Sequence, residues 1–134
     1  MTTRGLKPLR HPRAWLVLWW LAVLLVFAAC LLPARDLPSV PQGFDKLQHF
    51  LAFFVLAASA VQLYAGRRAL WCVALGLVCL GIAIEFAQHA LTATRSMDPR
   101  DVLADALGVA AGLAIAFTPL RDLLLRIEGR MLSR

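Results

Sequence analysis

The chain has 134 residues, of which 60% are hydrophobic, and its mean hydropathy is +0.71. A soluble domain has about 45–50% apolar residues, and one this small cannot hide more, so the composition excludes an ordinary soluble protein. The formal net charge is +6, but in a membrane protein the side on which Lys and Arg lie matters more than their sum. We therefore expect one integral membrane domain over residues 1–134, and no nucleic-acid partner.

Four apolar runs predict four transmembrane helices, at about 14–32, 47–65, 69–91 and 102–118. Each run has roughly 17–23 residues, enough at about 1.5 Å per residue to cross a hydrocarbon core of about 30 Å. Only helices satisfy all their own backbone hydrogen bonds in lipid, apart from closed barrels, so the predicted fold class is an all-α membrane bundle.

The first run has one alternative interpretation. A basic start and an apolar stretch ending near Cys30 are also features of a cleaved signal peptide. The run continues past Cys30, however, and its length suits a membrane span better. We therefore predict that it stays in the protein as the first helix.

The links between the runs are short or rich in proline. Residues 66–68 join the second and third runs, which must then be antiparallel neighbours. The link "PARDLPSVPQGF" at 33–44 contains three prolines, so it is predicted to run extended over the surface.

The distribution of Lys and Arg predicts the orientation. Ten of them lie before the first run, between the second and third, or after the fourth, and four lie on the other side. The positive-inside rule places the richer side in the cytoplasm, so both termini are predicted to be cytoplasmic.

The tail at 120–134 is predicted to form a short amphipathic helix. Leucine, isoleucine and methionine recur at helical spacing from Leu120 to Met131, while the arginines lie off that stripe. Such a helix is expected to lie at the inner interface, against anionic lipid.

The three cysteines, Cys30, Cys72 and Cys79, all fall inside apolar runs. Their spacing matches neither a disulfide framework nor a metal motif. We predict that they are small buried apolar residues.

Polar residues gather at matching ends of three predicted helices. They are Asp45, Lys46 and His49 in the second, Glu85, Gln88 and His89 in the third, and Asp98, Asp101 and Asp105 in the fourth, with Arg95 just before it. Within each helix these positions share one face. Each unpaired charge costs about 2.5–3.5 kcal/mol at the centre of a membrane helix, so these faces should turn inward and pair.

This convergence has two interpretations. Asp45, Asp98 or Asp101 could simply cap helices, and Arg95 with Glu85 could be a structural ion pair. We favour an outward-facing binding site, because ionisable residues from three helices reach the same depth. Gly108 and Gly112 lie on the Asp105 face of their helix and would let another helix approach it closely.

The chemistry of such a site stays open. Carboxylates and histidines can bind a divalent metal, but no compact spacing such as HExxH is present, so neither a metal nor another cofactor is predicted. Glu85 with His49 could act as a general acid–base pair, although Ser96 is the one candidate nucleophile at this depth. Binding of a polar ligand needs fewer special features, and we rank it first.

The polar residues, in this order, resemble the VanZ-like family of small bacterial membrane proteins. The resemblance rests on "DKLQHF" at 45–50, "IEFAQ" at 84–88, and then Arg95, Asp101, Asp105 and Gly108. It covers roughly 44–117, with the preceding helix in outline. Asp105 stands where the family more often has Asn, so its role there is in doubt. Nothing is carried over to His89 and Asp98, which do not match the pattern.

The family is named for a protein linked to resistance to the glycopeptide teicoplanin. The resemblance therefore implies a multi-pass protein of the bacterial inner membrane with a role in the cell envelope, without supplying a reaction. The residues expected to bind a lipid head group, a cell-wall precursor or a glycopeptide are Asp45, Lys46, His49, Glu85, Gln88, Arg95, Asp101 and Asp105. An enzyme acting on an envelope lipid, or a structural bundle that assembles into a homo-oligomer, are the alternatives.

Overall fold

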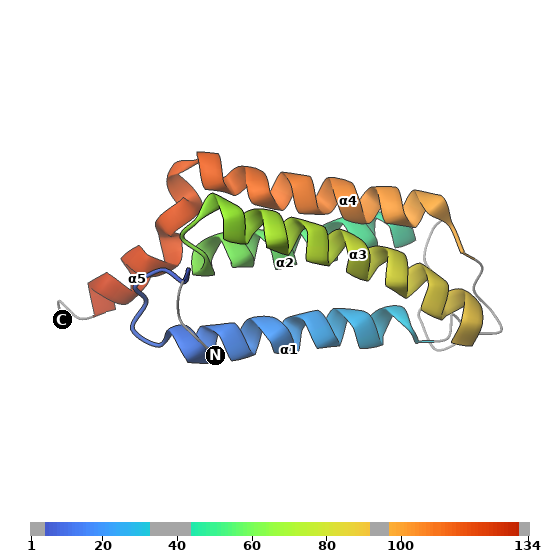
Figure 1. Ribbon diagram of the computed structural model, residues 1–134, viewed down its shortest axis with the longest axis horizontal. Coiled ribbons are helices and arrows are strands. Elements are labelled where there is room, and N and C mark those ends of the chain that lie inside the picture. The colour runs from blue at the N-terminus through green and yellow to red at the C-terminus, as the bar shows by residue number, and fades with distance from the viewer. Residues whose placement is uncertain (1–4, 33–43, 92–96, 132–134) are drawn as a thin grey trace.

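The computed structural model describes residues 5–32, 44–91 and 97–131, which are almost entirely helical (Figure 1). The elements are α1 (Pro12–Cys30), α2 (Phe44–Leu63), α3 (Arg67–Leu91), α4 (Pro99–Ala114), the 3-10 turns η2 (Ile115–Phe117) and η3 (Pro119–Asp122), and α5 (Leu123–Met131). α2, α3 and α4 pack together, and α1 lies along one side of them. The all-α fold class is confirmed.

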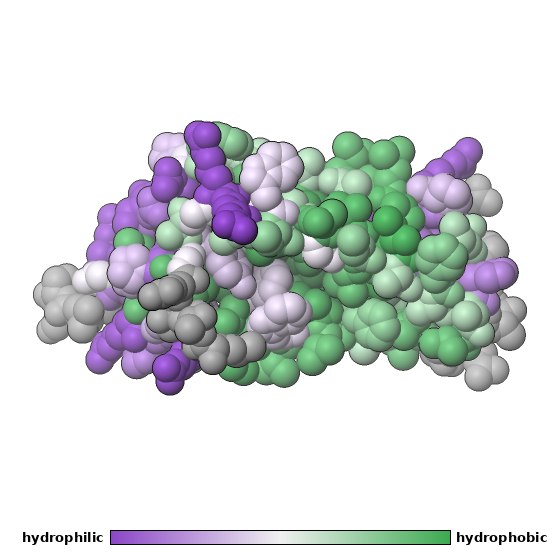
Figure 2. All heavy atoms as spheres, in the orientation of Figure 1, coloured by the Kyte–Doolittle hydropathy of each residue, from purple (hydrophilic) through white to green (hydrophobic). Residues whose placement is uncertain are grey.

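Within the described residues, α1, α2 and α3 are each long and apolar enough to cross a membrane. The fourth candidate span is a pair of segments bent by 80°, Pro99–Phe117 and Pro119–Arg130. Figure 2 shows apolar side chains along the middle of the molecule and polar ones concentrated toward its ends. The chain is therefore a multi-pass membrane protein, with three spans or, if the bent pair counts, four.

The predicted helix boundaries need small corrections. α2 begins at Phe44 and α4 at Pro99, each three residues before its predicted start. The physical reason is that the first turn of each helix is polar, and an apolar run does not reveal it. The predicted extended link lies outside the described residues except for Phe44, which is helical.

The bend after α4 has a local cause. Thr118 is extended (φ −110°, ψ 164°), and its hydroxyl accepts a hydrogen bond from the backbone N–H of Leu120 at 3.2 Å. Pro119 lacks the backbone N–H that a continuing helix would need at that position. The helical segment of α4 and η2 therefore ends before Thr118, and η3 begins after it in a new direction.

α2 forms the centre of the bundle. Phe53, Ala57 and Ala60 on α2 are fully buried, and Leu56 is 1% exposed. By contrast, α1 buries little of its surface and is attached through Trp19, whose indole N–H donates to the carbonyl of Leu56 at 2.9 Å. α1 is thus the most loosely packed of the long helices.

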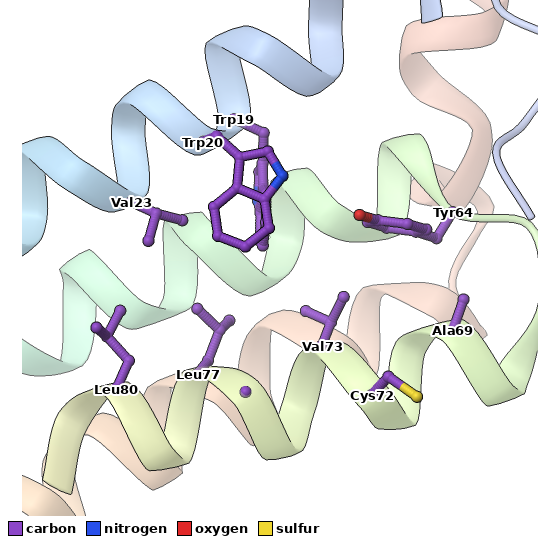
Figure 3. A pocket seen from close by; sticks show the side chains of 10 residues that line it. Trp19, Trp20, Val23, Tyr64, Ala69, Cys72, Val73, Leu77 and Leu80 are labelled. Carbon is purple, nitrogen blue, oxygen red and sulfur yellow. The ribbon is translucent and has the colours of Figure 1, made fainter. Parts of the chain in front are cut away.

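An apolar groove of about 380 Å³ separates α1 from α3 (Figure 3). Trp19, Trp20 and Val23 of α1 face Val73 and Leu77 of α3 across it. Its walls are almost wholly apolar, so the groove is suited to hydrocarbon and not to a polar ligand.

The cysteine prediction is wrong. Cys72 and Cys79 on α3 are exposed, and Cys30 is half-buried. An apolar run predicts that a residue lies at membrane depth, but in a small bundle much of that depth faces lipid instead of protein.

The tail is attached to the N-terminal segment. The buried Lys7 ammonium pairs with Asp122 at 2.8 Å and also donates to the carbonyl of Arg121. The Glu128 carboxylate accepts hydrogen bonds from the backbone N–H of Arg10 and from the indole of Trp15, both at 2.7 Å. The predicted amphipathic helix is present as α5, but it is also bound to the bundle and is not a free lipid anchor.

We expect this attachment to loosen in acid. The bonds from Arg10 and Trp15 lower the pKa of Glu128, and the bond from Lys7 lowers the pKa of Asp122. Carboxyls whose pKa is lowered by docking stabilise it fully above their ordinary values of about 4, and lose that contribution as the pH falls through the lowered values. The indole N–H resonance of Trp15 should therefore stay constant down to about pH 4 and shift as the pH falls further.

Glu128→Gln supplies the control for this titration. The amide keeps an acceptor for Trp15 but carries no charge, so the Trp15 resonance should lose most of its pH dependence. A resonance that moves equally in both proteins would mean that Glu128 does not hold the tail.

Candidate functional site

The polar residues of α2, α3 and the start of α4 meet at one end of the bundle, where α2 begins and α3 ends (right in Figure 1). We call them the polar cluster. Its members are Asp45, Lys46 and His49 of α2, Glu85 and Gln88 of α3, Asp98 immediately before α4, and Asp101 and Asp105 of α4.

Close approach of α4 to α2 brings these side chains together. A Cβ atom on Gly108 would collide with the backbone carbonyl of Phe50, and one on Gly112 would lie 2.5 Å from the carbonyl oxygen of Phe54. Both glycines therefore let α4 lie directly against the α2 backbone. The prediction that this face of α4 is both the packing face and the polar face is confirmed.

Lys46 links α2 to the start of α4. Its ammonium lies 2.9 Å from a carboxylate oxygen of Asp98, 3.1 Å from Asp101 and 3.2 Å from its neighbour Asp45. The Lys46 side chain is 31% exposed, so this network sits at the rim of the cluster, where water still reaches it. One cation thus holds three carboxylates together.

His49 lies deeper and pairs with α4. Its Nδ1 is 3.0 Å from Oδ1 of Asp105, and both side chains are buried. The second oxygen of Asp105, Oδ2, has no hydrogen-bond partner in residues 5–32, 44–91 and 97–131, and it lies against Gly81, where a Cβ would be only 2.6 Å away. Gly81 therefore gives Asp105 the space to reach His49.

Glu85 is the most deeply placed acid of α3, with 1% of its surface exposed. Its Oε2 accepts a hydrogen bond from the backbone N–H of Asp98 at 2.8 Å, which ties the end of α3 to the start of α4. Its other oxygen, Oε1, is buried and has no hydrogen-bond partner among the described residues. A buried carboxylate oxygen without a partner is costly, so this atom calls for an explanation.

Gln88 makes a hydrogen bond to α1, outside the polar cluster. Its amide donates to the backbone carbonyl of Cys30, the last residue of α1, at 2.7 Å. Terminal carbonyls of a helix have no partner within the helix. Gln88 therefore attaches α1 to α3 at this end of the bundle.

Asp98 is the cluster member that the sequence prediction of the site left out. It is the N-cap of α4, and its carboxylate accepts from the backbone N–H of Arg100 at 2.9 Å while also binding Lys46. The hydrogen bond from Arg100, followed by that from Lys46, lowers the pKa of Asp98. Helical spacing places Asp98 on the face of Asp101 and Asp105, but Asp98 does not match the family pattern and is therefore not among the expected site residues.

The expectation that His89 shares the polar face of Glu85 and Gln88 is wrong. Glu85 and Gln88 are buried, whereas His89, rotated by about 100° from Gln88 around the helix, is exposed. Arg95, predicted as a site residue and as a partner of Glu85, lies outside the described residues. Among the acids proposed as helix caps, Asp98 is one, whereas Asp45 and Asp101 lie within first turns.

The cluster contains groups that can bind a metal or move a proton. Ligand atoms of His49, Glu85 and Asp101 all lie within 4.8 Å of one another, although they come from three different helices. The same side chains are acids and bases. The apolar groove is lined by other residues and is not part of this site.

Comparison with known proteins identifies one match. A family model described as VanZ/LLP1 matches residues 8–124, which is most of the chain. Searches of curated proteins and of solved structures found no match.

Proposed function

The chain belongs to the VanZ/LLP1 family, and from this premise we propose that its polar cluster is an extracytoplasmic binding site in the bacterial inner membrane. Family membership and the apolar helices make it a multi-pass cell-envelope membrane protein. The proposal adds what the protein does there: it binds the polar part of a lipid, of a cell-wall precursor or of a glycopeptide.

One observation carries the proposal, namely the convergence of polar side chains from α2, α3 and α4 inside an apolar body. Stability alone does not call for buried charges, since well-packed apolar residues in their place are often as stable or more so. A protein keeps ionisable groups at membrane depth when they have a task. Lys46 at the rim and Glu85 in the interior would offer a ligand both a cation and an acid.

The distribution of Lys and Arg supports an outward-facing site. The end of the bundle opposite the cluster holds the start of α1, the turn between α2 and α3, and α5. Most of the Lys and Arg residues belong to those segments or to their flanks. The positive-inside rule then places that end in the cytoplasm and the polar cluster outside, where cell-wall precursors and glycopeptides meet.

The His49–Asp105 pair favours a second candidate function, that of an intramembrane enzyme acting on an envelope lipid. A carboxylate that binds one ring nitrogen orients a histidine as a general base, and Glu85 would be the complementary acid. Among the described residues, no serine or cysteine lies in the cluster as a nucleophile. We therefore keep binding as the main proposal.

The proposal predicts a resistance phenotype that depends on the cluster. Expression of the wild-type chain in a teicoplanin-sensitive host should raise the minimal inhibitory concentration, and Glu85→Gln or Asp101→Asn should return it to that of the empty vector. Each substitution removes one charge from the cluster at nearly constant shape. Susceptibility and the amount of protein in the membrane fraction are measured together.

Glu128→Gln is the matched control, because it neutralises a carboxylate at the opposite end of the bundle, and it should protect like wild type. If Glu85→Gln and Asp101→Asn protein disappears from the membrane, the cluster holds the bundle together and the binding proposal loses its support. If wild type gives no protection, teicoplanin resistance is not the task of this chain.

A further inference from the structure

Three side chains of the polar cluster have the composition and the placement of a metal site. We infer that His49, Glu85 and Asp101 bind one divalent transition-metal ion, such as Zn²⁺ or Mn²⁺, at the junction of α2, α3 and α4. Their ligand atoms lie within 4.8 Å of one another. Atoms bound to a common ion at about 2.1 Å lie at most about 4.2 Å apart, so small side-chain rotations complete the site.

The position of His49 supports this inference. Histidines that bind metals almost always bond a carboxylate, carbonyl or water through their other ring nitrogen, which fixes the ring. Nδ1 of His49 already pairs with Asp105 at 3.0 Å. Nε2 is therefore the nitrogen left to bind the ion, and Asp105 is a positioning residue.

Glu85 supplies an independent indication of a ligand. The side chain is 99% buried, since only 1% of its surface is exposed, and within the part of the chain that the structure describes Oε1 has no hydrogen-bond partner. Oε2 is fixed by the backbone N–H of Asp98, so the orientation of the carboxylate is set before any ligand binds. A metal ion would provide Oε1 with the partner that the described residues do not supply.

The charges of the cluster also favour a cation. Among the cluster members that the structure describes, five carboxylates, those of Asp45, Glu85, Asp98, Asp101 and Asp105, share one ammonium, that of Lys46, and one imidazole. Lys46 lies at the rim, 3.1 Å from Asp101, and reaches the outer acids. A divalent ion at the inner acids would balance the negative charge that Lys46 leaves.

The ligand types indicate which metals fit. Imidazole nitrogen suits Zn²⁺ and other transition metals, whereas Mg²⁺ and Ca²⁺ prefer oxygen alone. Three protein ligands leave at least one position free for water or for an anionic group of a bound molecule. The metal itself, however, can be tested without knowing the ligand of the proposed function.

The experiment measures metal binding by the purified full-length protein in detergent after treatment with a chelator. We expect about one equivalent of Zn²⁺ or Mn²⁺ to bind by calorimetry, with Mg²⁺ and Ca²⁺ at least ten-fold weaker. Glu85→Gln and Asp101→Asn should each abolish this binding, while Glu128→Gln should retain it. Asp105→Leu should weaken it about 10–100-fold, as loss of a group that orients a ligand does.

Co²⁺ absorption by the wild-type protein gives a second measurement that needs no cluster variant to fold. Bands typical of nitrogen and oxygen ligands, unchanged in Cys72→Ser/Cys79→Ser, support the site. Wild-type protein that binds no transition metal, or binding that survives Glu85→Gln and Asp101→Asn, overturns the inference. Either result leaves the proposed binding of an envelope molecule to be judged by the susceptibility assay.

Discussion

Replacing Gly108 by leucine should prevent the bundle from forming. A Cβ at this position would collide with the backbone carbonyl of Phe50 and lie 3.0 Å from the backbone nitrogen of Phe54. Backbone atoms of a helix cannot move aside as a flexible side chain can, so α4 must separate from α2. We expect a loss of about 3 kcal/mol or more, at the upper end of the range for overpacking.

The amount of protein in the membrane fraction and the melting temperature in detergent would measure this loss. Gly76→Leu is the matched control, because Gly76 also lies inside a helix but its Cβ would meet nothing within 4 Å. It should accumulate like wild type. Normal amounts of a stable Gly108→Leu protein would show that α2 and α4 do not pack as described.

Replacing Lys46 by methionine should destabilise the cluster end of the bundle. The change leaves the carboxylates of Asp45, Asp98 and Asp101 close together without their shared ammonium. Breaking a fully buried pair costs about 3–5 kcal/mol and a surface pair about 0–1, so we expect about 2 kcal/mol for this partly exposed network. Thermal unfolding should be followed with a chelator present, so that no metal ion replaces the lost charge.

Two further variants isolate the cause of this effect. Arg100→Met removes an exposed cation from the same end and should cost less than about 0.5 kcal/mol. Adding Asp101→Asn to Lys46→Met should restore part of the stability, because one of the opposing charges is then gone. Additive losses in the double variant would mean that Lys46 does not stabilise Asp101.

The sequence predicts the fold closely because the segments that lie in the hydrocarbon core are identified by their high hydropathy. The runs that contain α1, α2 and α3 are apolar enough to identify each span within two or three residues. The fourth apolar run ends at residue 118 and the amphipathic tail begins at 120, so the sequence also locates the break at Thr118, but it does not give the bend of 80°. That break depends on the missing N–H of Pro119 and on the extended backbone before it.

The sequence predicts at which membrane depth the polar side chains of the candidate site lie, but not which of them pair with one another. Helical spacing places Glu85, Asp101 and Asp105 near one another along the membrane normal, but not the contacts between helices. Those contacts depend on how far α4 approaches α2, which Gly108 and Gly112 decide. The three proposed metal ligands are 36 and 16 residues apart along the chain, taking His49 to Glu85 and Glu85 to Asp101, so no local motif could have revealed them.

The unequal lengths of the helices have a consequence for the surrounding lipid. α3 has 25 residues and α4 has 16, which correspond to about 37 Å and about 24 Å at 1.5 Å per residue. An upright α3 is therefore longer than a hydrocarbon core of about 30 Å, whereas α4 alone is shorter, although η2 continues it to Phe117. A helix longer than the core tilts or extends its polar ends into the headgroup region, so we expect the tilt of α3 to change with the thickness of the bilayer.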